Sequence, residues 1–320
     1  MLPFHKVAES DFLDVNQMIL DRLHSEVDLV ENIGEYIVDG GGKRLRPLVV
    51  LLAALSCGYT GRDHIKLACI IEFIHTATLL HDDVVDTSEL RRGRPTANTK
   101  WGNSPTVLVG DFLYSRAFQM LVELGNMPIM KLLADTTNAI AEGEVQQLIN
   151  AGDPNVTEQN YLNVIQKKTA ILFGAATSSG ALIANQPEAQ VQAFADYGRH
   201  LGTVFQLQDD VLDYTGDVNA MGKNIGDDLA EGKPTMPLIF AMREADETSA
   251  RLVSQAITHC DNSNIEQIID IVQSCGGLRY TRSLAQSEAE AARSALTNLP
   301  ENSYKQALLD LADFALDRNF

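Results

Sequence analysis

Hydrophobic positions along the chain recur with the period of an α-helix. The first series has members three or four residues apart, which share one face of a helix but alternate between the two faces of a strand: Phe12, Val15, Ile19, Leu23, Val27 and Val30. Prolines and glycines divide the rest of the chain into further expected helices. Expected helix starts are Ser104-Pro105, Asp153-Pro154 with Thr157 following, and Pro187, and expected breaks are Gly125, Gly216 and Gly276-Gly277. No run of alternating residues predicts a sheet, so the chain is predicted to be all-α.

The stretch from Ala170 to Ala184 is small and apolar on nearly all sides. It is expected either inside a helical bundle or at a subunit interface, and the core is the favoured location. No Ser-, Pro- or Gly-rich linker and no charge run divides the 320 residues. Residues 1–320 are therefore predicted to form one domain, and 45% hydrophobic residues suffice for a substantial core.

Composition excludes several classes of protein. A formal net charge of −18 argues against nucleic acid, which requires a basic face. The four cysteines have neither C-x-x-C spacing nor a histidine cluster, so a zinc site and a disulfide framework are both disfavoured. The N-terminus is charged where a signal peptide needs an apolar region, and the apolar run Leu48–Leu55 is too short to span a bilayer. A cytoplasmic protein without a transmembrane segment is expected.

One acidic pattern, Asp-Asp-x-x-Asp, occurs twice, at residues 82–86 and 209–213, 127 positions apart. Residues four apart lie about one turn, ~5.4 Å, along the same helix face, so the first and last Asp of each copy project together. Such pairs destabilise a solvated helix by roughly 0.2–0.5 kcal/mol, and more when buried, so two pairs facing one cavity imply a cation. Oxygen ligands with few protein contacts suit Mg²⁺, which completes its shell with water and substrate phosphates. The repeated pattern predicts a magnesium-bridged diphosphate site.

A single copy of this pattern also occurs on solvated faces, and this chain has 43 acidic residues. The flanks favour a site, because large apolar side chains seldom interrupt a solvated face: Leu79, Leu80, Val84 and Val85 around the first copy, and Phe205, Leu207, Val211 and Leu212 around the second. Arg91, Arg92 and Arg94 follow the first copy. In so acidic a chain this local reversal of charge indicates anion capture, because guanidinium groups bind phosphate oxygens bidentately.

These motifs, in this order, resemble those of the trans-type polyprenyl diphosphate synthases. The resemblance includes Gly40–Pro47, both acidic motifs, Gly222–Asp228 and Glu231–Thr235, five segments over about two hundred residues. The C-terminal helices are similar only in general character. The resemblance implies a single-domain all-α bundle of the isoprenoid synthase type, with about ten or more helices around a central cavity. It also implies a homodimeric prenyltransferase that uses two or three Mg²⁺ ions.

The resemblance also assigns roles to individual residues. The metal ligands would be Asp82, Asp86 and Asp209, within a catalytic set of Asp82, Asp83, Asp86, Asp209, Asp210, Asp213, Lys168 and Lys233. Isopentenyl diphosphate would be held by Lys43, Arg46, His75 and Arg92. The allylic diphosphate would be bound by Arg91, Lys168, Thr169, Gln206 and Lys233, with Lys223 a further substrate-binding residue.

Several of these residues have an ordinary alternative interpretation. Lys43 and Arg46 follow three glycines and suit a surface turn as well as an anion loop. A histidine among apolar residues, as His75 is, is more often a satisfied core residue. Asp227-Asp228 lies in a stretch whose Gly, Asn and Asp content is also typical of a plain loop. Gln206 lies three residues before Asp209, close to the same helix face, so a polar contact with a metal-bound phosphate is expected.

These residue types suit the ionisation of an allylic diphosphate. Cations beside the leaving diphosphate lower the barrier by neutralising the charge that develops on it. Isopentenyl diphosphate would then attack the allylic cation through its double bond, and proton loss would restore an alkene. No protein nucleophile is required, and the sequence indicates no Ser-His-Asp or Cys-His set. The released diphosphate is a candidate base.

Product length is predicted from the helix before the first acidic motif. Thr78 lies one turn below Asp82 on the same face, and Ala77 lies on the adjoining face. Both are small, whereas a short-chain enzyme of this resemblance would have a bulky aromatic floor there. Phe118, Met120 and Leu121 are candidates for a deeper floor, although ordinary core packing explains Met120 equally well.

The expected function is extension of farnesyl or another allylic diphosphate with isopentenyl diphosphate to an all-trans product near C40, for a quinone side chain. A C45 (nonaprenyl) product is the alternative. A terpene cyclase is less favoured, because cyclases usually replace the second Asp-rich motif and do not need Lys43 and Arg46. A non-catalytic helical subunit would typically lose one motif, whereas both are intact.

Overall fold

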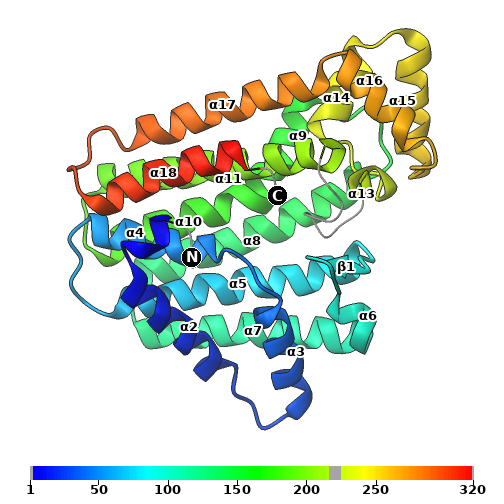
Figure 1. Cartoon of the computed structure of the whole chain (residues 1–320). Helices are drawn as coiled ribbons and strands as arrows, with labels where there is room; N and C mark the ends of the chain where they lie inside the picture. Colours follow the sequence, from blue (N-terminus) through cyan, green and yellow to red (C-terminus); the bar gives the residue numbers. More distant parts are fainter. Residues whose placement is uncertain (1–2, 216–224, 319–320) are drawn as a thin grey trace.

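The structure, a computed structural model, describes residues 3–215 and 225–318 and consists almost entirely of helices (Figure 1). The helices are α1 (Pro3–Lys6), α2 (Glu9–Leu23), α3 (Asp28–Asp39), α4 (Leu45–Ser56), α5 (Asp63–Val85), α6 (Ala97–Trp101), α7 (Asn103–Leu124), α8 (Met127–Asn150), α9 (Glu158–Ile165), the π-helix η1 (Gln166–Ala170), α10 (Ile171–Ile183), α11 (Glu188–Thr215), α13 (Asp227–Ala230), α14 (Met236–Glu244), α15 (Glu247–His259), α16 (Ile265–Ser274), α17 (Gly277–Ala295) and α18 (Ser303–Asp317). The prediction of an all-α fold is confirmed.

One short hairpin was not predicted. Strands β1 (Leu90–Arg91) and β2 (Arg94–Pro95) pair antiparallel directly after the first acidic motif. Two residues per strand are too few to produce a recognisable alternation of polar and apolar positions, so periodicity could not reveal it. Gly93 at the turn has φ 73°, a conformation that glycine adopts without the steric penalty of a Cβ.

Helix α10 lies at the centre of the bundle and packs against α4, α8 and α11. Almost every residue from Leu172 to Ile183 is buried, which confirms the predicted core location of this small, apolar stretch. Its glycines permit close helix contacts: a Cβ on Gly180 would lie only 2.8 Å from the Val50 carbonyl oxygen of α4. Helix α5 packs beside α7 and is likewise buried over most of its length.

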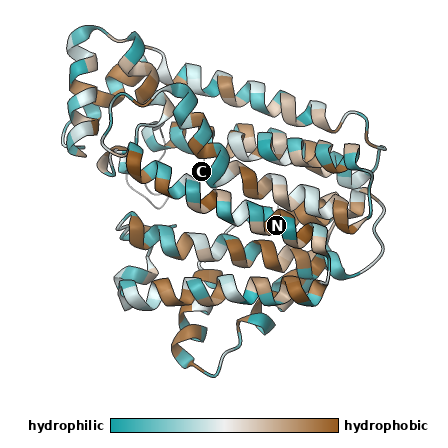
Figure 2. Ribbon diagram, turned by 180° about the vertical axis from the view of Figure 1, so that it is seen from behind, coloured by the Kyte–Doolittle hydropathy of each residue, from teal (hydrophilic) through white to brown (hydrophobic). Residues whose placement is uncertain are grey.

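The outer helices have one apolar and one polar face, as the alternating colours along α17 in Figure 2 illustrate. Helices α14 to α16 and α13 enclose a smaller cluster around Leu238, Val253 and Ile268, separate from the main core. In the described part of the chain, no helix combines the length and the apolar character needed to cross a membrane. The assignment of residues 1–320 to one domain stays a prediction.

Helix boundaries agree with the sequence signals in part. Thr157 caps α9 by accepting a hydrogen bond from the Asn160 amide, and Gly125 ends α7 in the left-handed conformation. The hydrophobic series expected to continue from Phe12 to Val30 is interrupted, because the chain leaves the helix after Leu23 and α3 begins only at Asp28. The hydrophobic residues keep their helical spacing across this break, so their pattern could not show where the first helix ends. Gly216, an expected break, lies outside the described residues.

Candidate active site

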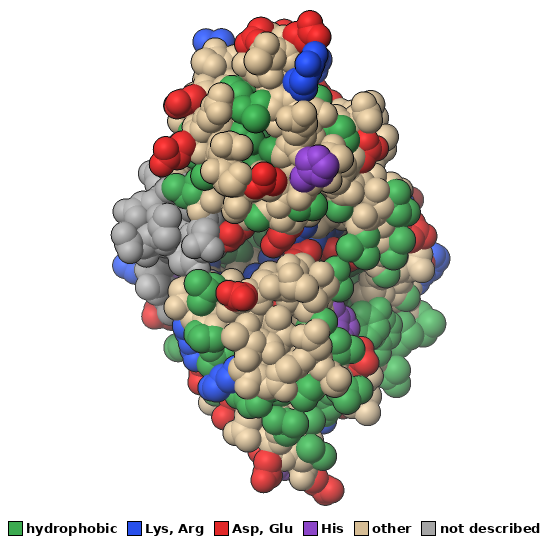
Figure 3. Space-filling model, turned by 90° about the vertical axis from the view of Figure 1, so that its right-hand side faces the viewer, with side chains coloured by type: hydrophobic (Ala, Val, Ile, Leu, Met, Phe, Trp, Pro, Cys, Tyr) green, Lys and Arg blue, Asp and Glu red, His purple; other side chains and the backbone are tan. Residues whose placement is uncertain are grey.

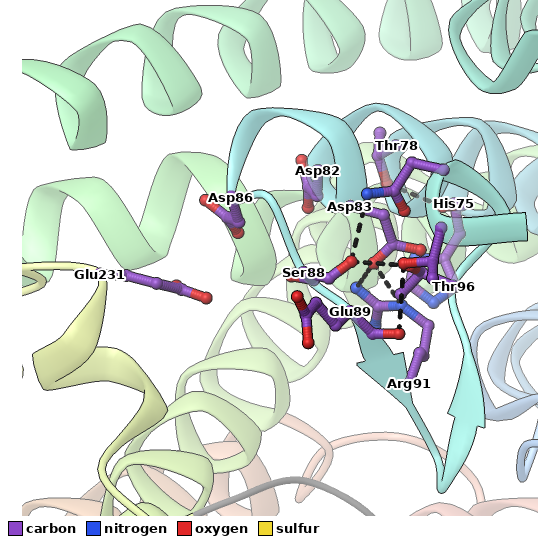
Figure 4. Close-up of polar contacts among 12 residues, drawn as sticks. His75, Thr78, Asp82, Asp83, Asp86, Ser88, Glu89, Arg91, Thr96 and Glu231 are labelled. Carbon is purple, nitrogen blue, oxygen red and sulfur yellow. Dashed lines mark hydrogen bonds and ion pairs between the residues drawn. The ribbon is translucent and has the colours of Figure 1, made fainter. Parts of the chain in front are cut away.

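The first acidic motif forms the C-terminal turn of α5, and its members point in different directions (Figure 4). Asp82 and Asp86 face the cleft between α5 and Glu231, and their side chains are 18% and 17% exposed. Asp83 is fully buried on another side of the helix, where one of its oxygens accepts hydrogen bonds from Arg91 Nε and Nη2 at 2.8 and 2.7 Å. The helical spacing therefore leaves two carboxylates, not three, facing the cleft.

Two lysines balance these two carboxylates. Lys168 Nζ lies 3.7 Å from Asp82 and 2.8 Å from Glu144, and Lys233 Nζ lies 2.8 Å from Asp86 and also pairs with Glu231. Burial raises the pKa of Asp82 and neighbouring Asp86 raises it further, while Lys168 acts in the opposite direction. Burial would lower the pKa of Lys233, but its carboxylate neighbours, Asp86 first, outweigh burial and raise it. Cations are thus held close to the carboxylates in a poorly solvated cleft.

The π-helix η1 presents Lys168 and Thr169 to this cleft. Its wider turn follows α9 and precedes the buried helix α10, and Lys167 and Lys168 are its two basic residues. Lys167 pairs with Glu142 at the exposed side, whereas Lys168 turns toward Asp82. Single π-turns are rare and occur frequently at functional sites, because they redirect side chains from the regular helical register. No sequence signal distinguished Lys168 from Lys167 without the family resemblance.

The second acidic motif lies near the end of α11 and has a different environment. Asp209 is 45% exposed on its side chain and forms an ion pair with Arg318, which also lies over the Phe205 ring. Asp210 is fully buried and accepts hydrogen bonds from the Tyr161 hydroxyl, Gln206 Nε2 and the Met236 amide. Burial and nearby Asp228 raise the pKa of Asp210 to about 7. Asp213 is also fully buried.

A polar chain connects the two sides of this region. Thr169 donates to Gln206 Oε1 at 2.9 Å, and Gln206 in turn donates to Asp210 at 3.1 Å. One pocket is lined by the predicted residues Lys168, Thr169, Gln206, Asp210 and Lys233, together with others that include Gln147, Tyr161, Asp228 and Thr235. The end-on view of Figure 3 shows a cleft in this part of the molecule with acidic and basic side chains along it. The structure therefore brings together four of the five expected allylic-diphosphate residues; the fifth, Arg91, does not line this pocket and pairs with Asp83.

The expected isopentenyl-diphosphate residues also come together, in what we call the arginine cluster (Lys43, Arg46, His75 and Arg92). Arg46 Nη1 donates to His75 Nε2 at 3.0 Å, and its guanidinium lies 4.4 Å from the Phe173 ring centre. Burial, reinforced by Arg46 and Arg92, holds the pKa of His75 well below its usual value, so the imidazole is neutral. Burial lowers the pKa of Arg46 to about 10, and it lowers that of Lys43 and Arg92.

Gly42 explains how Arg92 reaches the glycine-rich loop. A Cβ on Gly42 would lie 2.6 Å from Arg92 Nη1, and its φ of 138° also disfavours other residues. Glu72, one turn before His75 on α5, is a buried carboxylate whose pKa is raised by burial and lowered by Arg44, Arg46 and Arg92. Glu72 and Asp209, the two carboxylates that act on these cations, do not balance them, so the arginine cluster keeps a net positive charge, which suits a diphosphate.

The residues expected to set product length lie below the first motif. Ala77 is completely buried, and Thr78 is half-buried with its hydroxyl donating to the His75 carbonyl at 2.7 Å. Met120, on α7, is completely buried in the main core. No bulky aromatic occupies positions 77 or 78. Their roles in chain length stay predictions.

Some site residues were not predicted. Glu144, Tyr161, Glu231 and Arg318 each contact a predicted site residue, and all except Glu231 lie in stretches without a recognisable motif. Glu231 was noted only as part of the Glu231–Thr235 segment. The helical spacing of Glu144 from other polar residues is that of any solvated face, so only tertiary packing identifies it. Lys223, a predicted substrate-binding residue, lies outside the described residues.

The carboxylates suit a metal that receives further ligands from a substrate. Within residues 3–215 and 225–318, no three His, Cys, Asp or Glu side chains gather closely enough to hold an ion by themselves. Asp82 and Asp86 share one face, and Mg²⁺ commonly takes one or two carboxylates, with water and substrate phosphates as its other ligands. The raised pKa of Asp82 reflects burial and a nearby like charge, and a cation would relieve both.

Comparisons with known proteins identify the same family as the site residues do. The profile of the Polyprenyl synthetase family matches residues 27–274. The chain is 51% identical to octaprenyl diphosphate synthase of Haemophilus influenzae, over 98% of this chain and 96% of that protein. It is 49% identical to an all-trans-nonaprenyl-diphosphate synthase (geranyl-diphosphate specific) of Rhodobacter capsulatus, over 96% and 95%.

Among solved structures, a polyprenyl synthase of Caulobacter crescentus in complex with calcium and isoprenyl diphosphate is similar over 99% of this chain and 97% of that one. Its TM-score is 0.96 at 43% identity. These similarities confirm the resemblance, the isoprenoid synthase fold and the predicted enzyme class. The chain belongs to the polyprenyl synthetase family, in which it is a long-chain polyprenyl diphosphate synthase and hence a prenyltransferase.

Proposed function

We propose that this enzyme extends farnesyl diphosphate with successive isopentenyl diphosphates to an all-trans product of about C40, which supplies a quinone side chain. The observation that carries this proposal is the 51% identity to an octaprenyl diphosphate synthase over nearly the whole chain. The small residues at positions 77 and 78 support a long product, because they leave room one turn below the first motif. The similarity to a nonaprenyl synthase favours C45 as the second candidate.

The enzyme is proposed to use two or three Mg²⁺ ions, held by Asp82 and Asp86 on one side of the cleft and by Asp209 on the other. The shared face of Asp82 and Asp86 supports this assignment. Bound Mg²⁺ would neutralise the charge that develops on the leaving diphosphate. Asp83, which accepts hydrogen bonds from Arg91 on another side of α5, and Asp210, whose carboxylate accepts three hydrogen bonds at the wall of the pocket, are proposed to fix the two helix ends rather than to bind metal.

The allylic diphosphate is proposed to lie against Lys168, Thr169, Gln206 and Lys233, with Arg91 at the rim. Their common pocket supports this assignment, since all except Arg91 line it. The lysines would stabilise the leaving diphosphate electrostatically, and their present carboxylate partners keep them oriented before substrate binds. Lys168 and Lys233 are both less than one-fifth exposed, so little water would screen this effect.

The arginine cluster is proposed to bind isopentenyl diphosphate. Arg46 and Arg92 are preorganised guanidinium groups that suit phosphate oxygens, and neutral His75 orients Arg46 through their hydrogen bond. The cluster lies beside Phe173, whose ring supports the Arg46 guanidinium from one side. A second group of cations, in addition to the lysines beside Asp82 and Asp86, is the feature that a two-substrate condensation needs and a cyclase does not.

The working enzyme is proposed to be a homodimer that pairs through the outward faces of α7 and α8. These faces expose large apolar residues, each more than half exposed: Leu108, Val122, Val145, Leu148 and Ile149. Val145, Leu148 and Ile149 follow helical spacing and so lie on one face of α8. A second copy of the chain would cover an apolar face that is unusual on a monomer. The cytoplasmic location stays a prediction.

The central test is incubation of the purified protein with farnesyl diphosphate, labelled isopentenyl diphosphate and Mg²⁺, followed by product sizing. Products near C40 are expected, and no product after chelation.

Ala77→Tyr or Thr78→Phe should shift products toward C15–C20 at retained initial rate, because a ring one turn (~5.4 Å) below Asp82 would block the growing chain. Met120→Ala should lengthen products if Met120 is the deeper floor. Parent-length products from folded, active Ala77→Tyr and Thr78→Phe would refute the proposed path of the hydrocarbon.

A further inference from the structure

The glycine-rich loop that carries Lys43 is held by residues from the two ends of the chain, which lie close together in Figure 1. Its backbone has little stiffness of its own: Gly41 and Gly42 have φ of 79° and 138°, and Arg44 has φ 44°. Such a loop loses conformational freedom when it binds a ligand, and that loss weakens binding unless other contacts have already ordered the loop. The position of Lys43 therefore depends on what touches this loop.

His5, in α1, makes the most direct contact. Its Nε2 lies 2.9 Å from the Lys43 carbonyl oxygen. A carbonyl can only accept, so Nε2 carries the proton and donates. His5 is only 4% exposed, so water competes little for this hydrogen bond.

Aromatic rings fix His5 and the Lys43 side chain in the same cluster. The His5 ring packs against Phe12 edge-on, with centroids 4.8 Å apart, and Phe4 packs edge-on against Phe314 at 5.2 Å. The Lys43 ammonium lies 5.4 Å from the centre of the Phe314 ring, at a distance typical of cation–π attraction. Helix α1 thus holds the Lys43 backbone, and helix α18 supports its side chain.

We propose that His5 is a positioning residue for isopentenyl diphosphate, because it orders the loop that presents Lys43. This inference rests on the proposed role of the arginine cluster. His5 itself would not touch substrate. Loss of the His5 hydrogen bond should let the loop move, so the affinity for isopentenyl diphosphate should fall. The affinity for the allylic substrate should stay the same, because His5 does not contact the pocket that contains Lys168 and Gln206.

The test separates the hydrogen bond from the ring packing. His5→Phe keeps an aromatic ring but removes the donor, and should raise KM for isopentenyl diphosphate roughly 3- to 10-fold, the size of one neutral hydrogen bond. KM for farnesyl diphosphate and kcat should stay near wild type. His5→Gln, which retains a donor, should recover most of the loss. Lys6→Ala, on the exposed side of the same helix, is the matched control and should change neither constant.

A double-mutant cycle shows whether His5 acts through Lys43. In a Lys43→Ala background, His5→Phe should add almost nothing, because the group it positions is absent. Full additivity would overturn the inference. An unchanged KM in His5→Phe when Lys43→Ala raises KM would also overturn it, and the proposed role of the arginine cluster would then stand without His5. If Lys43→Ala leaves KM for isopentenyl diphosphate unchanged, the role proposed for the arginine cluster is itself wrong, and the inference falls with it.

Discussion

The two Asp-Asp-x-x-Asp motifs are identical in pattern but not in environment. In the first, Asp82 and Asp86 face the cleft with a lysine beside each, and Asp83 is buried against Arg91. In the second, Asp209 is the exposed member and pairs with Arg318, while Asp210 is buried among neutral donors. The first motif therefore has charged partners for all three of its carboxylates, whereas the second anchors its middle carboxylate without a cation.

This difference shows that one sequence pattern contains two kinds of residue. The middle Asp of each copy is fully buried and hydrogen-bonded, so it ties the helix end to a neighbouring segment. For Asp83 that segment is the hairpin β1–β2, through Arg91, and for Asp210 it is α9 and the start of α14, through Tyr161 and the Met236 amide. Loss of an outer Asp should impair the reaction, whereas loss of a middle anchor should first impair stability and geometry.

The largest expected effect is on turnover. Asp82→Ala and Asp209→Ala should each lower kcat by roughly 10²-fold or more, because each removes charge stabilisation at the leaving group. Steady-state kinetics with farnesyl and isopentenyl diphosphates measures this effect, and circular dichroism confirms that the variants fold. Comparable losses would support a site shared by both motifs. Near-normal turnover in folded Asp209→Ala would restrict the metal site to the first motif.

The next largest effect concerns the anchor of the first motif. Arg91→Ala leaves the buried Asp83 without its ion-pair partner, and should lower the free energy of unfolding by roughly 2–3 kcal/mol. This value is below the full penalty for an unpaired buried charge, because Arg91 is 31% exposed and Asp83 can take up a proton. Urea denaturation at pH 7.5 measures it. Arg94→Ala, in the same hairpin, is the control, and an equal loss there would mean that the hairpin rather than the ion pair matters.

The anchor of the second motif should give a pH effect. The pKa of Asp210 is about 7 in the folded chain and ordinarily 3.8, so between these values the folded chain holds a proton that the unfolded chain has lost. Stability from this group therefore rises as pH falls from 7 toward 5, by at most ~1.4 kcal/mol per pH unit. In metal-free protein, Asp210→Asn should remove this component from the unfolding free energy. Parallel pH profiles for wild type and variant would contradict it.

The features that could be predicted from the sequence are those that depend on the local pattern of residues, and those that could not depend on tertiary contacts or on very short segments. Helical periodicity sufficed for the all-α fold, and the small and mostly apolar residues of α10 sufficed to predict its burial. Periodicity also gave the shared face of Asp82 and Asp86, which is a property of one helix. The break between α2 and α3 and the hairpin at residues 90–95 were missed, since neither changes the local pattern.

The site was predictable where residues belong to ordered motifs, and not where tertiary packing alone brings them in. Lys168 and Lys233 came from the family resemblance, and the structure brings each beside a carboxylate of the first motif. Their other partners, Glu144 and Glu231, were not assigned roles, because an acidic residue on a helix or in a loop has no distinguishing spacing. Tyr161 was missed for the same reason: a tyrosine at a helical core position is ordinary until its hydroxyl meets a buried carboxylate.

The smallest expected effect isolates that hydroxyl. Tyr161→Phe removes one of three donors to Asp210 and should lower the free energy of unfolding by about 1 kcal/mol, the usual range for a buried hydrogen bond. Tyr197→Phe is a matched control, since Tyr197 is also buried and donates to the Leu308 carbonyl of α18 rather than to an acidic motif. Both variants should lose similar stability, but only Tyr161→Phe should also raise KM for the allylic substrate, by roughly 2- to 5-fold, because Asp210 holds Gln206 in the pocket. Equal kinetics in the two variants would mean that Asp210 is anchored well enough by Gln206 and the Met236 amide, and that Tyr161 contributes packing alone.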